Sequence, residues 1–422
     1  MSKIQKVVAR EILDSRGNPT VEVRVVLNNG LWAKASAPSG ASTGIHEAWE
    51  LRDSDKNRYL GKGVLRAIKN VNTIINKSLV DKDVREQRAI DELMIGLDDS
   101  DNKKNLGANA ILPVSLACAR VAAQFESIEL FEYIAKTYNL NTDSYKLPIP
   151  SFNIFNGGKH ADTNLDFQEF MIMPIKKTSF RERVRMGSEI FHHLGRVLRT
   201  AGLDTDVGNE GGYAPSITSS VQAIELIISA IINAGYNPGT EVGIGIDVGA
   251  SELYNKETGK YLFKLDGAQY SANDLISLYY EWFRKYPIIS IEDGLDEDDW
   301  ESWRKLNKEL GNEMLLIGDD LFVTNIERLR MGLKEKAANA VLIKPNQIGT
   351  LSETMDCIAL ANKHNMKTMT SHRSGDTCDN FIADLAVAAG NDYIKSGSLS
   401  RSERLSKYNR LMEIEAILNN EI

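Results

Sequence analysis

Charged residues stand at the ends of six successive short apolar segments in the second half of the chain. They are Asp247, Glu292 with Asp293, Asp319 with Asp320, Lys344, His372 with Arg373, and Lys395. One such residue alone is usually a solvated loop charge or a helix N-cap, but six in succession form a pattern. If the segments are parallel strands of one barrel, their carboxyl ends meet at one mouth, where the active sites of such folds lie. The pattern therefore predicts a cluster of acids and bases.

Three of these predicted strand ends carry carboxylates that would converge, namely Asp247, Glu292 and Asp319. Burying unpaired carboxylates together is unfavourable, so their convergence predicts a cation between them. Oxygen ligands with no cysteine or histidine near by favour Mg²⁺ over Zn²⁺. Lys344 would face this ion from the next strand, and a lysine beside a divalent cation should lose its proton more readily than in water. Lys344 is thus a candidate general base.

The elements that must position these residues are short apolar strands alternating with longer helical stretches. Six such strands are predicted at residues 242–248, 288–291, 314–318, 340–343, 366–370 and 393–394. Two more, near 152–154 and 169–173, bring the number to eight. Continuous apolar runs are typical of parallel strands buried on both faces. We therefore expect an α/β fold with an eight-stranded, TIM-like β/α barrel. A doubly wound open sheet is the alternative, but no GxGxxG follows an early strand.

The first third of the chain predicts a smaller α+β domain. Strands are expected at 4–13, 20–27 and 31–35, joined by short turns into an antiparallel meander, with helices at 63–76, 84–95 and 108–124. Residues 137–150 are polar and punctuated by proline, which is typical of a boundary between domains. We expect an N-terminal capping domain at 1–137 and a catalytic barrel at 138–422.

Composition and charge exclude several classes of protein. The chain has 422 residues and a formal net charge of −8, with no concentrated basic face of the kind that nucleic-acid binding needs. Its three cysteines fit no metal or disulfide motif, which favours reduced thiols in a cytosolic protein. The chain start lacks the apolar core of a signal peptide, and no run reaches the ~20 apolar residues of a membrane helix. We expect a cytoplasmic protein with no membrane span and no nucleic-acid partner.

Nine segments, in order along the whole chain, carry a resemblance to a known family. They are 14–22 (DSRGNPTVE), 38–44 (PSGASTG), 156–160 (NGGKH), 168–171 (QEFM), 208–212 (GNEGG), 290–294 (SIEDG), 318–325 (GDDLFVTN), 344–349 (KPNQIG) and 371–375 (SHRSG). Together they resemble the enolase family. The resemblance implies a glycolytic and gluconeogenic lyase that converts 2-phospho-D-glycerate reversibly to phosphoenolpyruvate and water. It also implies two Mg²⁺ ions per site, one tight and one substrate-dependent, and a homo-oligomer, either a dimer or an octamer.

The resemblance also assigns roles by position. Asp247, Glu292 and Asp319 would hold the tighter ion, and Ser39 would be a ligand of the second. Lys344 would remove the C2 proton. Glu210, assisted by Glu169, would be the general acid for the leaving hydroxyl. To stay protonated near neutral pH, Glu210 needs a raised pKa, supplied by burial or by a neighbouring carboxylate.

The remaining implied residues contact the phosphorylated substrate. Arg373 and Ser374 match phosphate contacts, and guanidinium geometry suits a pair of phosphate oxygens. His160 matches a histidine on a lid over the reacting centre. The other predicted substrate-site residues are His372, Gln168 and Lys395, with Lys395 near the substrate carboxylate.

Two positions depart from the usual family pattern. Asn209 replaces an aspartate that often precedes the acidic residue at 210, which removes a charge that could tune its pKa. Gly249 replaces the usual alanine, a change that we expect to be tolerated. Two rival hypotheses are another enolase-superfamily enzyme, such as a racemase or sugar-acid dehydratase, and a binding protein without turnover. No substitution at Lys344 or Glu210 favours the second.

Overall fold

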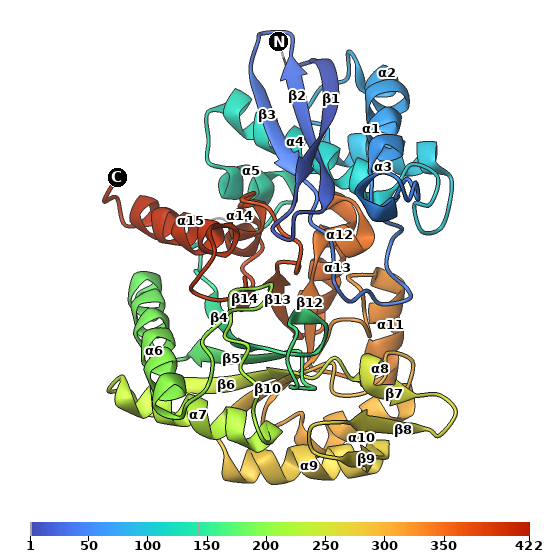
Figure 1. Ribbon diagram of the computed structural model, residues 1–422. Coiled ribbons are helices and arrows are strands. Elements are labelled where there is room, and N and C mark those ends of the chain that lie inside the picture. The colour runs from blue at the N-terminus through green and yellow to red at the C-terminus, as the bar shows by residue number, and fades with distance from the viewer. Residues whose placement is uncertain (1, 142–143) are drawn as a thin grey trace.

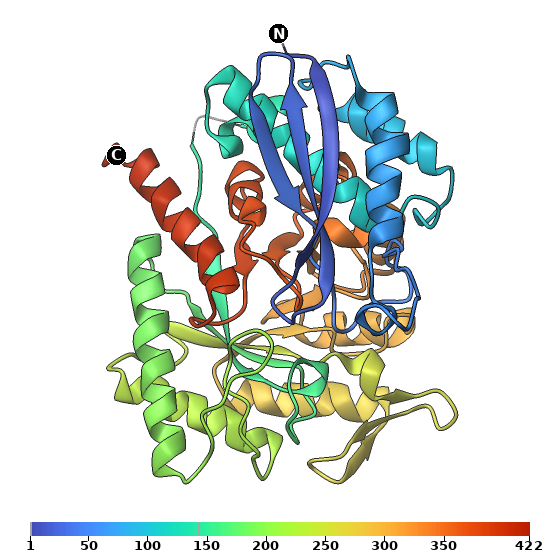
Figure 2. The ribbon, with the colours of Figure 1, turned by 45° about the horizontal axis from the view of Figure 1, so that its top comes forward.

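The computed structural model describes residues 2–141 and 144–422. Met1 lies outside the described residues. It belongs to the N-terminal segment that, by prediction, is not a signal peptide. Residues 142–143 of the predicted boundary segment also lie outside the described residues. An N-terminal α+β part lies at one end of a barrel in two views (Figure 1, Figure 2). α5 ends at Thr137 and β4 begins at Ile149. Where the boundary falls between them remains a prediction.

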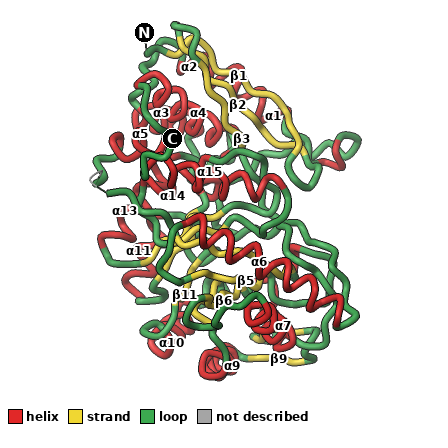
Figure 3. The backbone as a smooth tube through the Cα atoms, turned by 90° about the vertical axis from the view of Figure 1, so that its left-hand side faces the viewer, coloured by secondary structure: helices red, strands yellow, loops and turns green. Residues whose placement is uncertain are grey.

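The N-terminal part is an antiparallel sheet packed on helices. Its strands, in spatial order, are β1 (Ile4–Leu13), β2 (Pro19–Leu27) and β3 (Trp32–Ser36). Its helices are α1 (Leu65–Asn70), α2 (Asn76–Leu79), α3 (Gln87–Asp98), α4 (Ala108–Glu126) and α5 (Leu130–Thr137), with a π-helical turn at Val71–Ile75 joining α1 to α2. Figure 3 shows α3, α4 and α5 gathered on one side of this sheet. The predicted meander and helices correspond to these elements within a few residues.

Helix α4 is the centre of this part, because it packs against both β2 and β3. By length and composition it is the one helix of the described residues that could cross a membrane, but 83% of its apolar stretch is buried inside the protein. That degree of burial is what a core helix of a folded domain shows, since an all-round apolar helix must be covered on every face.

The rest of the chain forms a closed barrel of eight strands in the ring order β4-β5-β6-β10-β11-β12-β13-β14. The strands are β4 (Ile149–Asn156), β5 (Glu169–Pro174), β6 (Val242–Asp247), β10 (Ile288–Glu292), β11 (Leu315–Gly318), β12 (Ala340–Ile343), β13 (Lys367–Ser371) and β14 (Tyr393–Lys395). The predicted eight-stranded barrel with a separate N-terminal part is therefore confirmed. A continuous apolar run such as β6, buried at every position, fits because helices cover the outside and side chains fill the inside.

One strand corrects the expectation of a wholly parallel sheet. β5 runs antiparallel to both of its neighbours, β4 and β6. Residues 157–168 contain only the single turn η3 (Gly158–His160), so no crossover helix returns the chain to the far end of the barrel. The reversal puts the first residue of β5 at the mouth, where Glu169 lies opposite Asp247 in the register.

Helices surround the barrel (Figure 1). The long ones are α6 (Phe180–Thr200), α7 (Ser220–Asn233), α9 (Ala272–Lys285), α10 (Trp300–Leu310), α11 (Ile326–Glu335), α13 (Leu351–Lys363), α14 (Phe381–Ala388) and α15 (Ser402–Leu418). The turns α8 (Ala250–Leu253) and α12 (Pro345–Ile348) follow β6 and β12. A small antiparallel sheet of β7 (Tyr254–Asn255), β8 (Lys260–Phe263) and β9 (Ala268–Tyr270) lies between α8 and α9 in the chain.

A buried carboxylate joins the two parts of the protein. Asp91 on α3 accepts hydrogen bonds from the backbone N–H and the hydroxyl of Ser352, at 3.0 and 2.7 Å, in the first turn of α13. It also accepts one from the Gln87 amide at 3.1 Å. Burial raises the pKa of Asp91 from 3.8 to about 6, because desolvation outweighs these hydrogen bonds.

As pH rises, the Asp91→Asn variant should gain stability relative to the native protein. The folded state holds the Asp91 proton more tightly than the unfolded state, so the favourable contribution is complete below pH 4 and is lost as pH rises through 6. The variant escapes this loss, and its stability relative to the native protein should increase by about 2–3 kcal/mol between pH 4 and 7. The asparagine amide could donate to Gln87 Oε1, which is buried without a partner.

Urea unfolding of both proteins at several pH values measures this difference. Glu92→Gln is the matched control, because Glu92 is exposed on the same helix. A difference between the Asp91 variant and the native protein that does not change with pH would contradict the assignment.

Candidate active site

The predicted charged residues meet at one mouth of the barrel. Asp247, Glu292 and Lys395 are the last residues of β6, β10 and β14. Asp319, Lys344 and His372 directly follow β11, β12 and β13, and Glu169 begins the reversed strand β5. All but Lys344, which is half-buried, are buried. The parallel strands deliver their final residues to this edge, and the reversal of β5 delivers its first.

Lys395 lies among the carboxylates of three adjoining strands. Its Nζ donates to Glu292 Oε1 at 2.7 Å, to Asp247 Oδ2 at 3.2 Å and to Glu169 Oε1 at 3.4 Å. Burial acts to lower the pKa of Lys395, but Glu169, Glu292 and Asp247 outweigh it and raise the pKa well above the ordinary value. Lys395 is therefore a permanent positive charge at the centre of the mouth.

Lys344 pairs with the third predicted metal ligand. Its Nζ donates to Asp319 Oδ2, while the other oxygen of Asp319 accepts a hydrogen bond from Gln347 at 2.8 Å. Burial acts to lower the pKa of Lys344, but Asp319 outweighs it and the pKa is raised. The expected fall in this pKa depends on a cation beside Lys344 and stays a prediction for the metal-bound site; here the nearest charge to Lys344 is negative.

The three predicted metal ligands occupy neighbouring strands without forming a compact triad by themselves. Asp247 and Glu292 share Lys395, and Asp319 is engaged by Lys344. Among the described residues, the groups close enough to share one ion are Asp293 with Asp319 and Asp320, and His160 with Glu169 and Glu210. Acidic clusters that could hold a metal are thus present at the mouth.

Glu292 supplies the test of whether a divalent cation fits. Its Oε2 is buried without a hydrogen-bond partner. Burial and the charge of Asp247 raise the pKa of Glu292 well above the ordinary value, although Lys395 is near. Glu292, Asp247 and Glu169 share the cation Lys395, so the cluster keeps an excess of negative charge, and its oxygen donors suit a hard ion such as Mg²⁺. The residues fit.

A second group lies on the β5 side of the mouth. His160 Nδ1 is 3.4 Å from Glu169 Oε1 and 3.5 Å from Glu210 Oε1. Glu210 Oε2 lies 3.3 Å from His372 Nε2 and accepts a hydrogen bond from Asn153 at 3.0 Å. His160 is 4% exposed, so the predicted lid histidine is packed into the site in this structure.

The pKa directions in this group correct one prediction. Burial acts to raise the pKa of Glu210, but His160 and His372 outweigh it, and the pKa is lowered well below the ordinary value. Burial together with Glu210 raises the pKa of Glu169 to about 7. Burial opposes protonation of His160, but Glu210 and Glu169 raise its pKa. The raised pKa predicted for Glu210 is found at Glu169 instead, because His372 approaches Glu210 alone while His160 lies next to both carboxyls.

Arg373 is already bound to a carboxylate from the N-terminal part. Its two terminal nitrogens donate to the two oxygens of Glu47, at 2.8 and 3.1 Å, and one of them also donates to the carbonyl of Ser42 at 3.1 Å. This is the forked geometry with which a guanidinium holds two oxygens of one anion. Ser374, next in the chain, is buried. Its carbonyl accepts a hydrogen bond from Ser15 Oγ at 3.2 Å.

The two serines of the loop 39–50 have different contacts. Ser39 pairs with Gly375 through the backbone, and its hydroxyl donates to Glu50 at 3.0 Å and accepts from Arg52 at 3.1 Å. Because this hydroxyl is engaged, the metal role predicted for Ser39 stays a prediction. The serine beside Arg373 is Ser42. Sequence reasoning missed Ser42 and Glu47, although both lie in or next to the segment PSGASTG.

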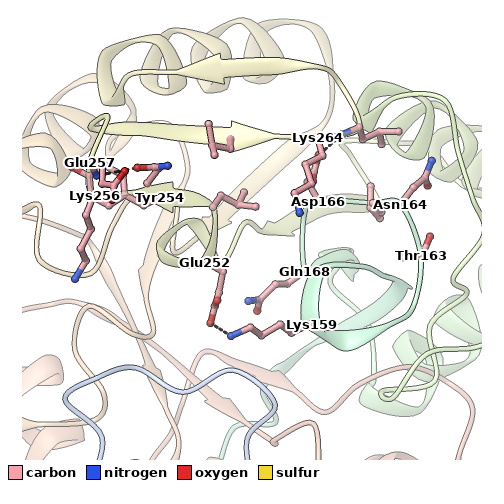
Figure 4. A pocket seen from close by; sticks show the side chains of 17 residues that line it. Lys159, Thr163, Asn164, Asp166, Gln168, Glu252, Tyr254, Lys256, Glu257 and Lys264 are labelled. Atoms are coloured by element: carbon pink, nitrogen blue, oxygen red, sulfur yellow. Dashed lines mark hydrogen bonds and ion pairs between the residues drawn. The ribbon is translucent and has the colours of Figure 1, made fainter.

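Gln168 lies at the rim of a cavity of about 1130 Å³ between the β4–β5 loop and the α8–β8 region (Figure 4). A Cβ atom at Gly249 would come within 2.3 Å of Gln168 Nε2, and Gly249 has a positive φ of +57°. Both facts favour glycine over alanine at 249, and tolerance of the change stays a prediction. Lys159 and Glu252 form an ion pair across the same rim.

Comparison with known families covers nearly the whole chain. Residues 4–134 match the model of the enolase N-terminal domain, and residues 144–422 match that of the enolase C-terminal TIM barrel domain.

Proposed function

This chain belongs to the enolase family of lyases, and on that premise we propose that it is a phosphopyruvate hydratase. The proposed reaction is the reversible dehydration of 2-phospho-D-glycerate to phosphoenolpyruvate, a step of glycolysis and gluconeogenesis. We propose a cytoplasmic homo-oligomer, either a dimer or an octamer.

One observation carries the proposal: a lysine and a carboxyl pair enter the mouth from opposite sides. Lys344 follows β12 and Glu169 begins β5, and these strands are four places apart in the ring of eight. Removing a proton from one face of a substrate and a hydroxyl from the other requires a base and an acid placed in this way.

Lys344 is the proposed base at C2. The proton next to a carboxylate is barely acidic, because its removal builds a second negative charge on the same group. We propose two Mg²⁺ ions per site, the tighter one held by Asp247, Glu292 and Asp319. Bound Mg²⁺ would neutralise these carboxylates and the charge that develops on the substrate carboxylate. With Asp319 engaged in this way, Lys344 Nζ would be free to accept the C2 proton.

Glu210 and Glu169 are the proposed acid. Breaking the C3–O bond would release hydroxide, a poor leaving group, unless a proton arrives as the bond breaks. The pair shares His160, and because the pKa of Glu169 is raised to about 7, Glu169 can hold a proton near neutral pH. Transfer of that proton to the departing oxygen gives water and leaves both carboxyls ionised.

Arg373 and the residues beside it are the proposed phosphate and carboxylate contacts. A phosphate offers two oxygens to the guanidinium fork as Glu47 does here, so it would displace Glu47. Ser374 and His372, next to Arg373 in the chain, would line the same side, and Gln168 would contact the substrate from the β4–β5 loop. Lys395 would hold the substrate carboxylate with its permanent charge.

Chelation should switch this enzyme off reversibly. Purified protein should produce the ultraviolet absorbance of an enol phosphate from 2-phosphoglycerate in Mg²⁺. With excess EDTA the rate should fall at least about 100-fold, because charge stabilisation at the enolate is lost, and it should return when Mg²⁺ is restored. Circular dichroism before and after chelation is the control for folding. A rate that is indifferent to EDTA, or no product with Mg²⁺ present, would contradict the proposal and favour another enolase-superfamily reaction.

A further inference from the structure

Arg404 is a fully buried arginine, 0% exposed, in the first turn of α15. Charged groups are rarely buried without several hydrogen bonds, because desolvation is unfavourable. The two terminal nitrogens of Arg404 bind three separate loops. They contact His372 Nδ1 at 2.6 Å and donate to the carbonyls of Arg373 at 2.6 Å, Ser374 at 2.6 Å and Asn209 at 2.9 Å, and to Ser15 Oγ at 3.2 Å.

The contact with His372 determines where the histidine holds its proton. An arginine has only donors, so His372 Nδ1 must be the acceptor and cannot carry hydrogen. The proton of the neutral ring is then on Nε2, which lies 3.3 Å from Glu210 Oε2. Burial, with the charge of Arg404, lowers the pKa of His372 to about 4, against the opposing effect of Glu210. The ring is therefore neutral at pH 7 and donates to Glu210.

The same guanidinium also fixes the backbone that carries the acid. Arg404 binds the carbonyl of Asn209, and the carbonyl of Glu210 accepts a hydrogen bond from Ser398 N–H at 2.9 Å. Glu210 is thus held from its side chain through His372 and from its main chain by segments next to α15.

We propose that Arg404 is a positioning residue for the dehydration step, which fixes His372 as the Nε2–H tautomer and so directs one hydrogen-bond donor at Glu210. The inference rests on the proposed function for the step that it serves, but the tautomer can be measured without turnover. A merely structural arginine would hold α15 against the barrel without dictating the protonation of the His372 ring.

The first measurement is ¹⁵N NMR of histidine-labelled full-length protein at pH 7. The His372 signals, identified by their loss in His372→Gln, should show Nε2 protonated and Nδ1 unprotonated. In Arg404→Met the donor to Nδ1 is lost, so the ring should shift toward the Nδ1–H tautomer. Arg404→Lys keeps a charged donor and should restore the native pattern at least in part.

Kinetics give the second readout. Arg404→Met should reduce dehydration about 10- to 100-fold, while exchange of the C2 proton with solvent stays within about threefold of native, because Lys344 is untouched. Arg410→Lys, on the same helix and paired with Asp384 at 2.7 Å, is the control for altering another arginine of α15, one that is half-buried.

Two results would overturn the proposal: a native His372 that is protonated at Nδ1, or an Arg404→Met variant that loses exchange and dehydration equally with its tautomer unchanged. If that variant does not fold, the native spectrum still decides. If the native protein does not act on 2-phosphoglycerate, the proposed function fails. The tautomer assignment is then still decided by the ¹⁵N spectrum of the native protein.

Discussion

Replacing Lys344 by alanine should abolish both dehydration of 2-phosphoglycerate and exchange of its C2 proton with solvent. The variant removes the amine proposed to accept that proton, and Lys395, the other lysine described at the mouth, is committed to Glu292 and Asp247. Losing a general base at the first chemical step should reduce both rates by about 10⁴-fold or more. Exchange in deuterated buffer, followed by proton NMR, measures the first step independently of the second.

The control for Lys344→Ala is Lys305→Ala. Lys305 forms an exposed ion pair with Glu301 on α10, on the outside of the barrel, and its loss should leave both rates near native. Retention of C2 exchange in Lys344→Ala would remove Lys344 from the proposed role. Lys344→Arg tests whether the lost pairing with Asp319 is the cause, because arginine can still pair with Asp319. If Lys344→Arg is equally inactive, the loss of exchange comes from loss of the base.

Glu210→Gln should separate the two steps that Lys344→Ala removes together. Glutamine keeps the size of the side chain and can still contact Asn153 and His372, but it has no negative charge to raise the pKa of Glu169. Dehydration should fall by about 10²- to 10⁴-fold, whereas C2 exchange should remain measurable because Lys344 lies on the opposite side of the mouth.

The matched control is Glu225→Gln, since Glu225 is exposed on α7 outside the barrel. Glu169→Gln is the informative companion, because Glu169 has the raised pKa. If the two carboxyls share one proton, both variants should lose dehydration to a similar extent. Equal loss of exchange and dehydration in Glu210→Gln would contradict the separation of base and acid.

The position of the site could be predicted from sequence because the barrel converts a linear pattern into a spatial one. Six of the eight apolar runs end at a charged residue, and closure of the ring brings Asp247, Glu292 and Lys395 to the same edge. The direction of β5 could not be predicted in this way, because a six-residue apolar run reads the same whichever way it points. The missing signal was in the preceding segment: residues 157–168 show no helical periodicity, which a crossover requires.

Which residue each charged group contacts could not be predicted from the sequence. The segment PSGASTG holds two serines, and only the folded loop decides that Ser39 contacts Glu50 while Ser42 contacts Arg373. The reversal of the expected pKa between Glu210 and Glu169 has the same origin. It depends on which carboxyl the rings of His160 and His372 approach, and those distances are set by packing.

The contacts of Ser39 with Gly375 and of Ser15 with Arg404 have a consequence for biosynthesis. Ser15 and Ser39 thus meet residues from the last fifty of the chain, so the site is complete only after almost all of a nascent chain has left the ribosome. At ordinary translation speeds, Ser39 waits roughly 20 to 70 seconds for Gly375 to be made. During that interval the β1–β3 sheet must either stay folded on its own core or be bound by a chaperone.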